Sequence, residues 1–366
     1  MKKMLGIMAI GMGMVFGSAA IAQTKPVKLT YASYYGENYT VSRTDIWVMN
    51  EIEKRTNGKV TFERYHNSTL LKAPDIYPGL TRGAVDVASG TPGAYNRNQY
   101  RLSNISLPYI TADAYAVSMA LTDLYKTSAA FRQEYESQNA KVLYFLAWGE
   151  NSFYMGKKPV TSAGDFKGQR VRAVQAVAEA VQAMGGTPVA ITWNEAVEGL
   201  SRGVVDIAGS IPFDSGVFGG IYQQAKYGTN GGDLGIFAFA TISMSKKRFD
   251  SFDPETQKII MQVASEAPAK YMEFLEESYT DVVDRLCKAT AKGDLVINMF
   301  TKEESDKAAK IANAVIQPNW VKWAGETVKT DTKAFLTEYI DLVRKYEAQS
   351  KWKSGYQRLV ERKCAK

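Results

Sequence analysis

The sequence reads GLTRGAVDVASG over residues 79–90 and GLSRGVVDIAGS over residues 199–210, and seven of the twelve positions are identical. Each copy is typical of a helix end, a glycine where the left-handed conformation costs little, and a short buried strand that an aspartate opens. Because this α/β pattern occurs twice, the repeat predicts two similar α/β lobes in tandem.

A loop is predicted directly after each copy, at residues 91–95 (TPGAY) and at residues 211–215 (IPFDS). Ligands of open α/β sheets bind beyond the carboxyl ends of the strands. We therefore expect the two loops to face one another across a cleft between the lobes.

The rest of the chain fits the same architecture. A proline follows an N-cap aspartate at residues 253–254 and begins a long helix, which runs to about residue 292 and which Pro268 can bend. Two extended segments and this helix are expected to join the lobes, and the chain from residue 301 onward is predicted to be helical. The other predicted elements are strands at 28–32, 60–65, 141–146, 152–155 and 170–174, helices at 42–56 and 176–184, and a β-rich apolar segment at 234–244.

The first residues are typical of a cleaved signal peptide. A charged start at Lys2 and Lys3 precedes an apolar run over residues 4–17 and a small-x-small cleavage site, AIA, at residues 20–22. We therefore expect residues 1–22 to be removed and the mature chain to be a soluble protein of the periplasm.

The composition indicates a globular protein, with 45% hydrophobic and 23% charged residues. The formal net charge is +7, but the basic residues are interspersed with acidic ones and form no dense stripe of the kind that binds nucleic acid. The charge therefore argues against a nucleic-acid partner and weakly favours a small anionic solute.

Few residues are available for catalysis or metal binding. His66 is the single histidine, which disfavours a histidine-dependent triad and a multi-histidine zinc site. No nucleophile elbow, phosphate-binding loop or dinucleotide fingerprint occurs, so we expect neither an enzyme nor a cofactor, although carboxylate or lysine chemistry stays open. Cys287 and Cys364 are too few for a metal cluster, and the sequence leaves open whether they form a disulfide.

Five short motifs occur together in the order that one known family shows. The most specific is DFKGQRVR at residues 165–172, and the others are TNGKV at 56–60, GGTPV at 185–189, WNEAV at 193–197 and GVVD at 203–206. In this order and spacing, the chain resembles the substrate-binding proteins of tripartite ATP-independent periplasmic (TRAP) transporters, of the dicarboxylate-binding type.

The resemblance implies an α/β fold of the two-lobed periplasmic binding protein type, with an interlobe cleft and a long helix that spans both lobes. It implies a monomer that binds a small organic carboxylate between the lobes and delivers it to the subunits of a membrane permease. A periplasmic solute sensor and an enzyme on the same fold are the alternatives. The expected boundaries are 23–147 and 234–275 for lobe I, 148–233 and 276–303 for lobe II, and 304–366 for C-terminal helices that pack on the lobes.

The resemblance assigns the ligand's carboxylate to Arg172, whose guanidinium offers a rigid fork of donors and a permanent charge. Asn151 stands where many relatives have a second arginine. One cation fewer favours a monocarboxylate, or a ligand with a neutral second polar group. Whether a metal ion bridges the carboxylate stays open.

Other site positions follow from the same resemblance. Trp193 matches an aromatic position that lines the pocket, Ser210 stands where many relatives have asparagine, and Tyr34 and Thr91 match contact positions of the first lobe. Aromatic and polar residues gather on nearby predicted loops, which predicts an aromatic-walled pocket suited to an aromatic or branched 2-oxo or 2-hydroxy acid. The further candidates are Tyr35, Asn38, Tyr39, Tyr95, Tyr154, Phe213 and Asp214.

Overall fold

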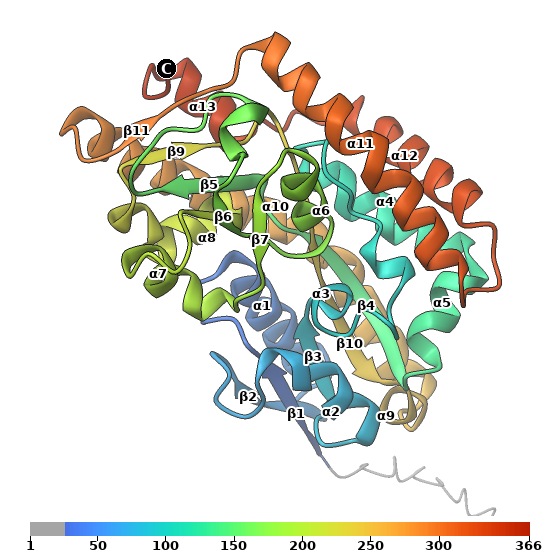
Figure 1. Cartoon of the computed structure of the whole chain (residues 1–366). Coiled ribbons are helices and arrows are strands. Elements are labelled where there is room, and N and C mark those ends of the chain that lie inside the picture. The colour runs from blue at the N-terminus through green and yellow to red at the C-terminus, as the bar shows by residue number, and fades with distance from the viewer. Residues whose placement is uncertain (1–25) are drawn as a thin grey trace, which may run out of the picture.

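The computed structural model describes residues 26–366, apart from the side chain of Asn194, so the predicted signal peptide lies outside the described residues. Two β-sheets form the centres of two lobes, and helices surround both sheets (Figure 1). The predicted α/β class is confirmed.

The first sheet has the strand order β2-β1-β3-β10-β4. β1 pairs in parallel with β2 and β3, as the predicted β-α-β opening requires, whereas β10 is antiparallel to β3 and β4. The strands are β1 (Val27–Ser33), β2 (Val60–Tyr65), β3 (Val87–Gly90), β4 (Ala140–Ala147) and β10 (Phe239–Ser245).

The second sheet has the strand order β11-β9-β5-β8-β6-β7. β6 is parallel to β7 and β8, whereas β5 is antiparallel to β8 and β9. The chain therefore changes sheets between β4 and β5, between β9 and β10, and again before β11. The strands are β5 (Asn151–Met155), β6 (Arg170–Arg172), β7 (Thr187–Val189), β8 (Ile207–Pro212), β9 (Tyr227–Thr229) and β11 (Val296–Ile297).

The longest helix is α10 (Pro254–Ala291), which begins and ends where the sequence predicts and continues through Pro268. Its N-cap residue Asp253 accepts a hydrogen bond from the N–H of Thr256 at 3.1 Å. Within residues 26–366, no helix combines the length and the apolar character needed to cross a bilayer. The other helices are α1 (Thr40–Arg55), α2 (Ile76–Arg82), α3 (Pro92–Tyr95), α4 (Ala114–Thr127), α5 (Ala129–Glu136), α6 (Gln175–Ala183), α7 (Trp193–Ser201), α8 (Phe213–Phe218), α9 (Lys246–Asp250), α11 (Lys302–Gly325), α12 (Thr332–Glu347) and α13 (Gly355–Glu361), with short 3-10 turns η1 (Ala73–Asp75), η2 (Leu102–Asn104), η3 (Ala163–Phe166) and η4 (Ile221–Gln224).

The two copies of the repeat adopt the same local structure. In each copy a helix, α2 or α7, leads through a glycine with positive φ (76° in the first copy, 71° in the second) to a strand, β3 or β8. Asp86 Oδ2 accepts the backbone N–H of Thr30 at 3.0 Å, and Asp206 Oδ2 accepts that of Arg170 at 2.9 Å. Each aspartate therefore fastens its strand to the neighbouring parallel strand, and the predicted helix-glycine-strand pattern is confirmed.

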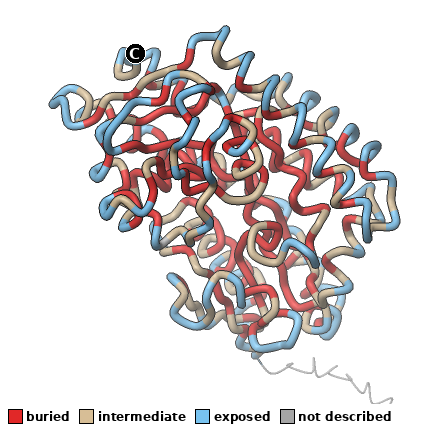
Figure 2. The backbone as a smooth tube through the Cα atoms, viewed as in Figure 1, coloured by how far each residue is buried: buried red, intermediate tan, exposed pale blue. Residues whose placement is uncertain are grey.

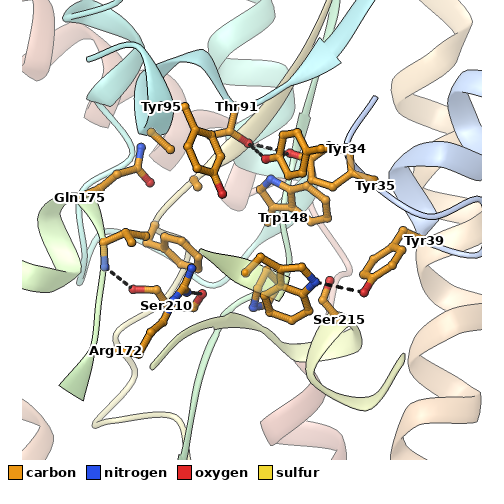
Figure 3. A pocket seen from close by; sticks show the side chains of 16 residues that line it. Tyr34, Tyr35, Tyr39, Thr91, Tyr95, Trp148, Arg172, Gln175, Ser210 and Ser215 are labelled. Atoms are coloured by element: carbon orange, nitrogen blue, oxygen red, sulfur yellow. Dashed lines mark hydrogen bonds between the residues drawn. The ribbon is translucent and has the colours of Figure 1, made fainter. Parts of the chain in front are cut away.

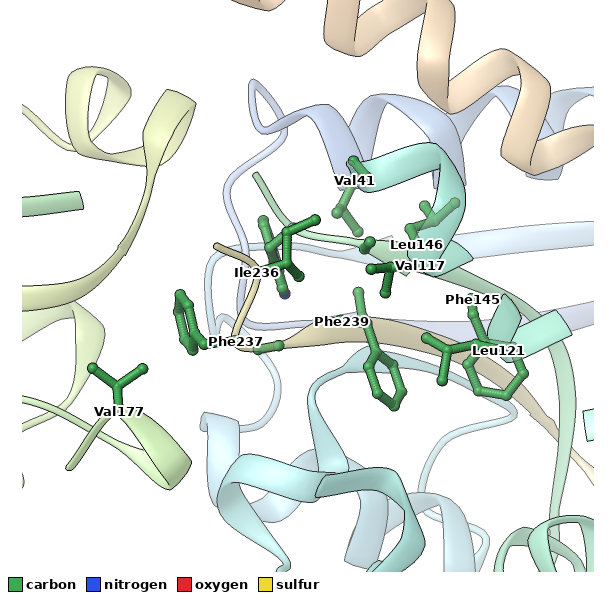
Figure 4. Close-up of a cluster of buried hydrophobic side chains, with 14 of the residues drawn as sticks. Val41, Val117, Leu121, Phe145, Leu146, Val177, Ile236, Phe237 and Phe239 are labelled. Carbon is green, nitrogen blue, oxygen red and sulfur yellow. The ribbon is translucent and has the colours of Figure 1, made fainter. Parts of the chain in front are cut away.

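The buried apolar side chains form one continuous core that includes residues of both lobes. Buried residues, red in Figure 2, run through the interior of both lobes. In the first lobe, Val117 and Leu121 of α4 lie against Phe145 of β4, whose ring meets that of Phe239 of β10 edge to face at 5.7 Å (Figure 4). Phe237, two residues earlier in the chain, extends this core towards the second lobe. The core is thus continuous at the place where the chain crosses.

Two backbone segments cross between the sheets side by side. The N–H of Trp148, just after β4, donates to the carbonyl of Ala238, just before β10, at 3.2 Å, and the N–H of Asn151 donates to the carbonyl of Gly235 at 2.8 Å. α10 is a third connection, because it packs on α1 and β4 of the first lobe and on α8 of the second. The lobes are therefore joined by two paired extended segments and one long helix.

Glu150 lies in the first crossing segment and is 2% exposed. Its carboxylate accepts a hydrogen bond from the hydroxyl of Tyr279 on α10 at 2.7 Å, and others from the backbone N–H groups of Gly355 and Tyr356 at the start of α13. Burial raises the pKa of Glu150 to about 7, although these donors favour the charged form. One carboxyl group therefore ties the crossing segment to the long helix and to the C-terminal helix.

The C-terminal helices contact both lobes, since α11 packs on α6 and α12 packs on α4 (Figure 1). A disulfide joins Cys287 of α10 to Cys364, and the two cysteines are 77 residues apart in sequence. The last residue, Lys366, donates its backbone N–H to the carbonyl of Ile297 in β11 at 2.9 Å. The chain end is thus fastened to the second lobe both covalently and by strand-like pairing.

Raising the pH should destabilise the protein through Glu150. Its folded-state pKa of about 7 exceeds the ordinary carboxyl value, so the folded chain holds a proton that the unfolded chain has released, and stability falls from about pH 4.5 to about pH 7. We expect Glu150→Gln to reduce this fall. Urea unfolding at pH 5 and pH 7.5 measures the change in the free energy of unfolding. Glu303→Gln, at an exposed position of α11, is the matched control. The same change with pH in the wild type and in Glu150→Gln would contradict this expectation.

Removing the disulfide should lower the free energy of unfolding by about 2–5 kcal/mol, because the unfolded chain regains the freedom of a long closed loop. Cys364→Ser, Cys287→Ser and the double variant should lose the same amount, since each breaks the same bond. Guanidinium unfolding of the four proteins checks this expectation. An additional loss in the double variant would show that one thiol stabilises the fold in another way.

Candidate functional site

A pocket lies between the two lobes and encloses about 500 Å³ including its open mouth (Figure 3). The lining comes from three parts of the fold, which are the ends of β1 and β3 in the first lobe, the crossing segments, and the ends of β6 and β8 with α7 in the second. The lining residues are Tyr34, Tyr35, Tyr39, Thr91, Ala94, Tyr95, Trp148, Phe237, Ala238, Arg172, Val174, Gln175, Trp193, Ser210, Pro212 and Ser215.

Arg172, at the end of β6, is the single charged residue among these lining residues and is 3% exposed. Its Nε donates to the carbonyl of Ile191 at 3.2 Å, and its Nη1 donates to the carbonyls of Gly209 and Ser210 at 3.1 and 2.8 Å. Within residues 26–366 no carboxylate pairs with this guanidinium and no hydrogen bond engages its Nη2. The pocket thus holds a buried cation without an anion.

The charge of Arg172 persists despite its burial. Burial lowers the pKa of Arg172, but a guanidinium starts from a value so high that it stays protonated in proteins. An isolated buried charge is costly unless it is paired. A ligand carboxylate bound to Nη2 of Arg172 would supply the negative charge that pairs with the guanidinium.

The backbone around Arg172 is held in unusual conformations. Gln175 and Ser210 are not glycines, yet they have φ values of 53° and 54°. The hydroxyl of Ser210 accepts the N–H of Val174 at 3.0 Å and so fixes the end of β8 to the turn after β6. Such strain persists only where the surrounding structure enforces it, and it is concentrated at binding sites.

Close packing explains the glycine at position 209. A Cβ added there would lie 2.3 Å from the ring of Phe153 and 3.1 Å from the carbonyl oxygen of Arg172. Only glycine leaves room for the Phe153 ring against β8 at this position. The carbonyls of Gly209 and Ser210, which hold Nη1, lie in this segment of β8.

Aromatic side chains form most of the remaining wall. In the first lobe, the hydroxyls of Tyr34 and Tyr35 contact one another, and Thr91 Oγ1 lies 3.2 Å from the first and 2.7 Å from the second. The ring of Trp148 meets Tyr35 edge to face at 4.7 Å. Burial raises the pKa of Tyr34, Tyr35 and Tyr95, so their hydroxyls stay neutral and can donate hydrogen bonds.

The two lobes touch at the edge of the pocket. Trp193 Nε1 of the second lobe donates to the hydroxyl of Tyr39 of the first lobe at 3.2 Å (Figure 3). Thr40 Oγ1, at the start of α1, donates to Asp214 Oδ2 of α8 at 2.8 Å, and burial raises the pKa of that carboxyl. In this structure the two lobes are therefore in contact.

Eight of the thirteen residues named above as candidate ligand contacts lie together in the pocket wall, and five do not. Of these five, Asn151 is buried at the start of β5, Asn38 is exposed, Phe213 packs on Tyr279, and Asp214 bonds across the lobes. The residues in the wall are Arg172, Trp193, Ser210, Thr91, Tyr34, Tyr35, Tyr39 and Tyr95.

Two of the outlying residues, Phe213 and Asp214, share one physical reason. Residues 211–215 were expected to form a loop, but β8 extends to Pro212 and α8 begins at Phe213, so side chains alternate between the pocket and the core. Pro212 and Ser215 line the pocket, while Phe213 and Asp214 turn away from it. Tyr154, also named above, is buried in β5 and does not line the pocket.

Several lining residues were missed from the sequence. Trp148 carried a usable signal, because it directly follows a predicted buried strand at the point of crossing. Gln175 also carried one, since it lies three residues after Arg172 at the predicted start of a helix. Phe237 and Ala238 carried none, because only the pairing of the two crossing segments brings residues so distant from Arg172 into the wall.

Known proteins similar to this chain include bacterial solute-binding proteins. A solute-binding protein of Albidiferax ferrireducens is 26% identical over 303 residues, which cover 81% of this chain and 88% of that protein. A TRAP solute-binding protein from Rhodoferax ferrireducens T118, solved with benzoate, superposes with a TM-score of 0.76 at 20% identity, covering 88% of this chain and 99% of that one.

A TRAP periplasmic solute-binding protein from Bordetella bronchiseptica, solved with (R)- and (S)-mandelate, has a TM-score of 0.74 at 21% identity, covering 88% of this chain and all of that one. Other similar structures hold pyroglutamic acid and β-D-galacturonate. These likenesses confirm the predicted two-lobed fold and the resemblance to TRAP solute-binding proteins. Since the DctP model, described as bacterial extracellular solute-binding protein, family 7, matches residues 45–322, the chain belongs to that family.

Proposed function

We propose that this protein binds a small aromatic monocarboxylate between its lobes and delivers it, unchanged, to a TRAP permease from the periplasm. The observation that supports the carboxylate is Arg172, a buried guanidinium that has only backbone carbonyls as partners within residues 26–366. A carboxylate on Nη2 would offset the cost of burying this charge.

The number of cations supports one carboxylate rather than two. Arg172 is the single charged lining residue, and Asn151, which stands where many relatives have a second arginine, lies outside the wall. A second carboxylate would lose its water of hydration without gaining a cation, which costs several kcal/mol. A neutral group at the far end of the ligand avoids that cost.

The lining supports an aromatic ligand. Aromatic rings pack against one another in stacked or edge-to-face arrangements. Each such contact contributes about 0.5–1.5 kcal/mol beyond burial of apolar area. The ligands of similar proteins are chemically diverse, so the fold alone does not select this class, and the aromatic wall carries the argument. The aromatic lining residues are Tyr34, Tyr35, Tyr39, Tyr95, Trp148, Trp193 and Phe237.

Closure of the lobes is expected because the lining residues of the pocket come from both lobes. Arg172 belongs to the second lobe, while Tyr34 and Tyr95 belong to the first, so one ligand contacts both lobes only when they are close together. A ligand shifts such an equilibrium by its difference in affinity for the two states. The lobe-to-lobe hydrogen bonds of Tyr39 and Thr40 would then add to the closed state, which is the form a permease could recognise.

Replacing Arg172 should abolish tight binding. We expect Arg172→Ala to weaken the binding of benzoate or phenylacetate by about 2–5 kcal/mol, which is roughly 30-fold to several thousand-fold, because it removes a desolvated charge contact. Arg172→Lys should recover little, since one ammonium does not reproduce the guanidinium fork. Calorimetric titration measures both variants.

Arg170→Ala is the matched control for this experiment. It lies two residues earlier on β6, is exposed, and pairs with Asp206 at 2.9 Å on the surface, so its removal should leave affinity unchanged. Undiminished affinity in both Arg172 variants would remove this residue from the site. Preferential binding of a C4-dicarboxylate over aromatic acids would refute the aromatic monocarboxylate.

A further inference from the structure

The orientation of one buried amide at the cleft is decided by its hydrogen bonds. Asn104, at the end of η2 in the first lobe, donates its Nδ2 to the carbonyl of Tyr100 at 2.9 Å. Its amide oxygen therefore points the other way, towards the second lobe. A reversed amide would place two oxygens together, so this orientation is determined.

The amide of Gln175 is oriented in turn by Asn104. Gln175 Nε2 donates to Asn104 Oδ1 at 3.4 Å, across the cleft. Because Asn104 presents an acceptor, Gln175 must present its NH₂ group to it. The oxygen of Gln175 is consequently directed to the opposite side.

That oxygen is a buried acceptor with no hydrogen-bond donor among residues 26–366. Gln175 lines the pocket, and Figure 3 shows its amide reaching into the pocket on the same side as Arg172. A buried polar atom without a partner destabilises the folded protein. The protein keeps this acceptor next to the place where the ligand's carboxylate would bind.

The backbone of Gln175 supports a role in binding. Its φ of 53° is strained for a residue other than glycine, and it stands at the first position of α6, directly after the turn that carries Arg172. Strain of this kind is retained where a side chain must be held in one direction. Arg172 and Gln175 thus lie at the two ends of the short turn that joins β6 to α6.

We propose that Gln175 determines specificity by accepting a hydrogen bond from a hydroxyl group next to the ligand's carboxylate, and that Asn104 positions it. This inference rests on the proposed function, because the carboxylate must lie on Arg172. A 2-hydroxy acid supplies the donor that Oε1 lacks. A 2-oxo acid supplies only another acceptor, and an unsubstituted acid leaves Oε1 unpartnered.

The positioning step depends on closure. Asn104 belongs to the first lobe and Gln175 to the second, so the amide of Gln175 is oriented only when the lobes meet. The neighbouring hydroxyl of Tyr95 can either donate or accept, so it does not distinguish the two kinds of acid. Discrimination between a hydroxyl and a keto group therefore falls to Gln175.

The test compares three acids that differ at one carbon atom: mandelate, phenylacetate and phenylglyoxylate. We expect the wild type to bind mandelate about tenfold more tightly than phenylacetate, which is the effect of one buried hydrogen bond, and to bind phenylglyoxylate no better than phenylacetate. Gln175→Leu should bring the mandelate to phenylacetate ratio close to one, because it removes the acceptor for the hydroxyl. Calorimetric titration gives all the ratios.

Two variants and a control complete the design. Asn104→Ala should lower the same ratio with a smaller effect, since it releases the amide of Gln175 without removing it. Gln182→Leu makes the same change at an exposed position of α6 and should leave the ratio as in the wild type. Gln175→Met, which is close to glutamine in shape, replaces Gln175→Leu if that variant does not fold.

The outcomes separate this inference from the proposed function. If the wild type binds none of the three acids, the aromatic monocarboxylate is refuted. If the wild type binds phenylacetate but shows no preference for mandelate, or if Gln175→Leu or Gln175→Met keeps the preference, only the role of Gln175 is refuted. Loss of affinity for all three acids alike in these variants also refutes it, because a structural effect does not depend on the hydroxyl.

Discussion

A buried guanidinium held by backbone carbonyls is the constraint on which the site depends. Arg172 has three such acceptors, from Ile191, Gly209 and Ser210, and within residues 26–366 no carboxylate neutralises it. Neutral acceptors orient the side chain without cancelling its charge, so attraction for an anion is preserved. The backbone around this side chain is held in strained conformations at Gln175 and Ser210.

The rest of the fold places the first lobe opposite Arg172. Two paired crossing segments and α10 join the lobes, and Glu150 ties the first crossing segment to α10 and α13. The C-terminal helices then contact both lobes, and a disulfide fastens the chain end to α10. The lobes are therefore joined by three connections, and hydrogen bonds and a disulfide hold these in place. This arrangement suits a protein whose lobes meet around a solute.

The chemistry of the wall divides recognition into parts. In the function proposed above, Arg172 would bind the carboxylate, the aromatic residues would contact a flat apolar body, and the oriented amide of Gln175 would accept from a donor beside the carboxylate. The first two contacts would set the class of ligand. The third would distinguish members of that class, because a buried acceptor is satisfied by a hydroxyl and by no keto group.

Local pattern alone determined much of this protein. The repeat at 79–90 and 199–210 and the N-cap and proline at 253–254 act over a few neighbouring residues, so the α/β lobes and α10 could be predicted. Arg172 could be named as a candidate because the motif that ends there resembles that of a known family. Tertiary structure alone decided which side chains of 211–215 face the pocket, that Asp214 bonds to Thr40 of the other lobe, and that Phe237 and Ala238 join the wall. It also decided the direction of the Gln175 amide, through Asn104 and Tyr100. These features depend on contacts between residues far apart in the chain, and such contacts arise only when packing sets strand register, helix start and lobe closure.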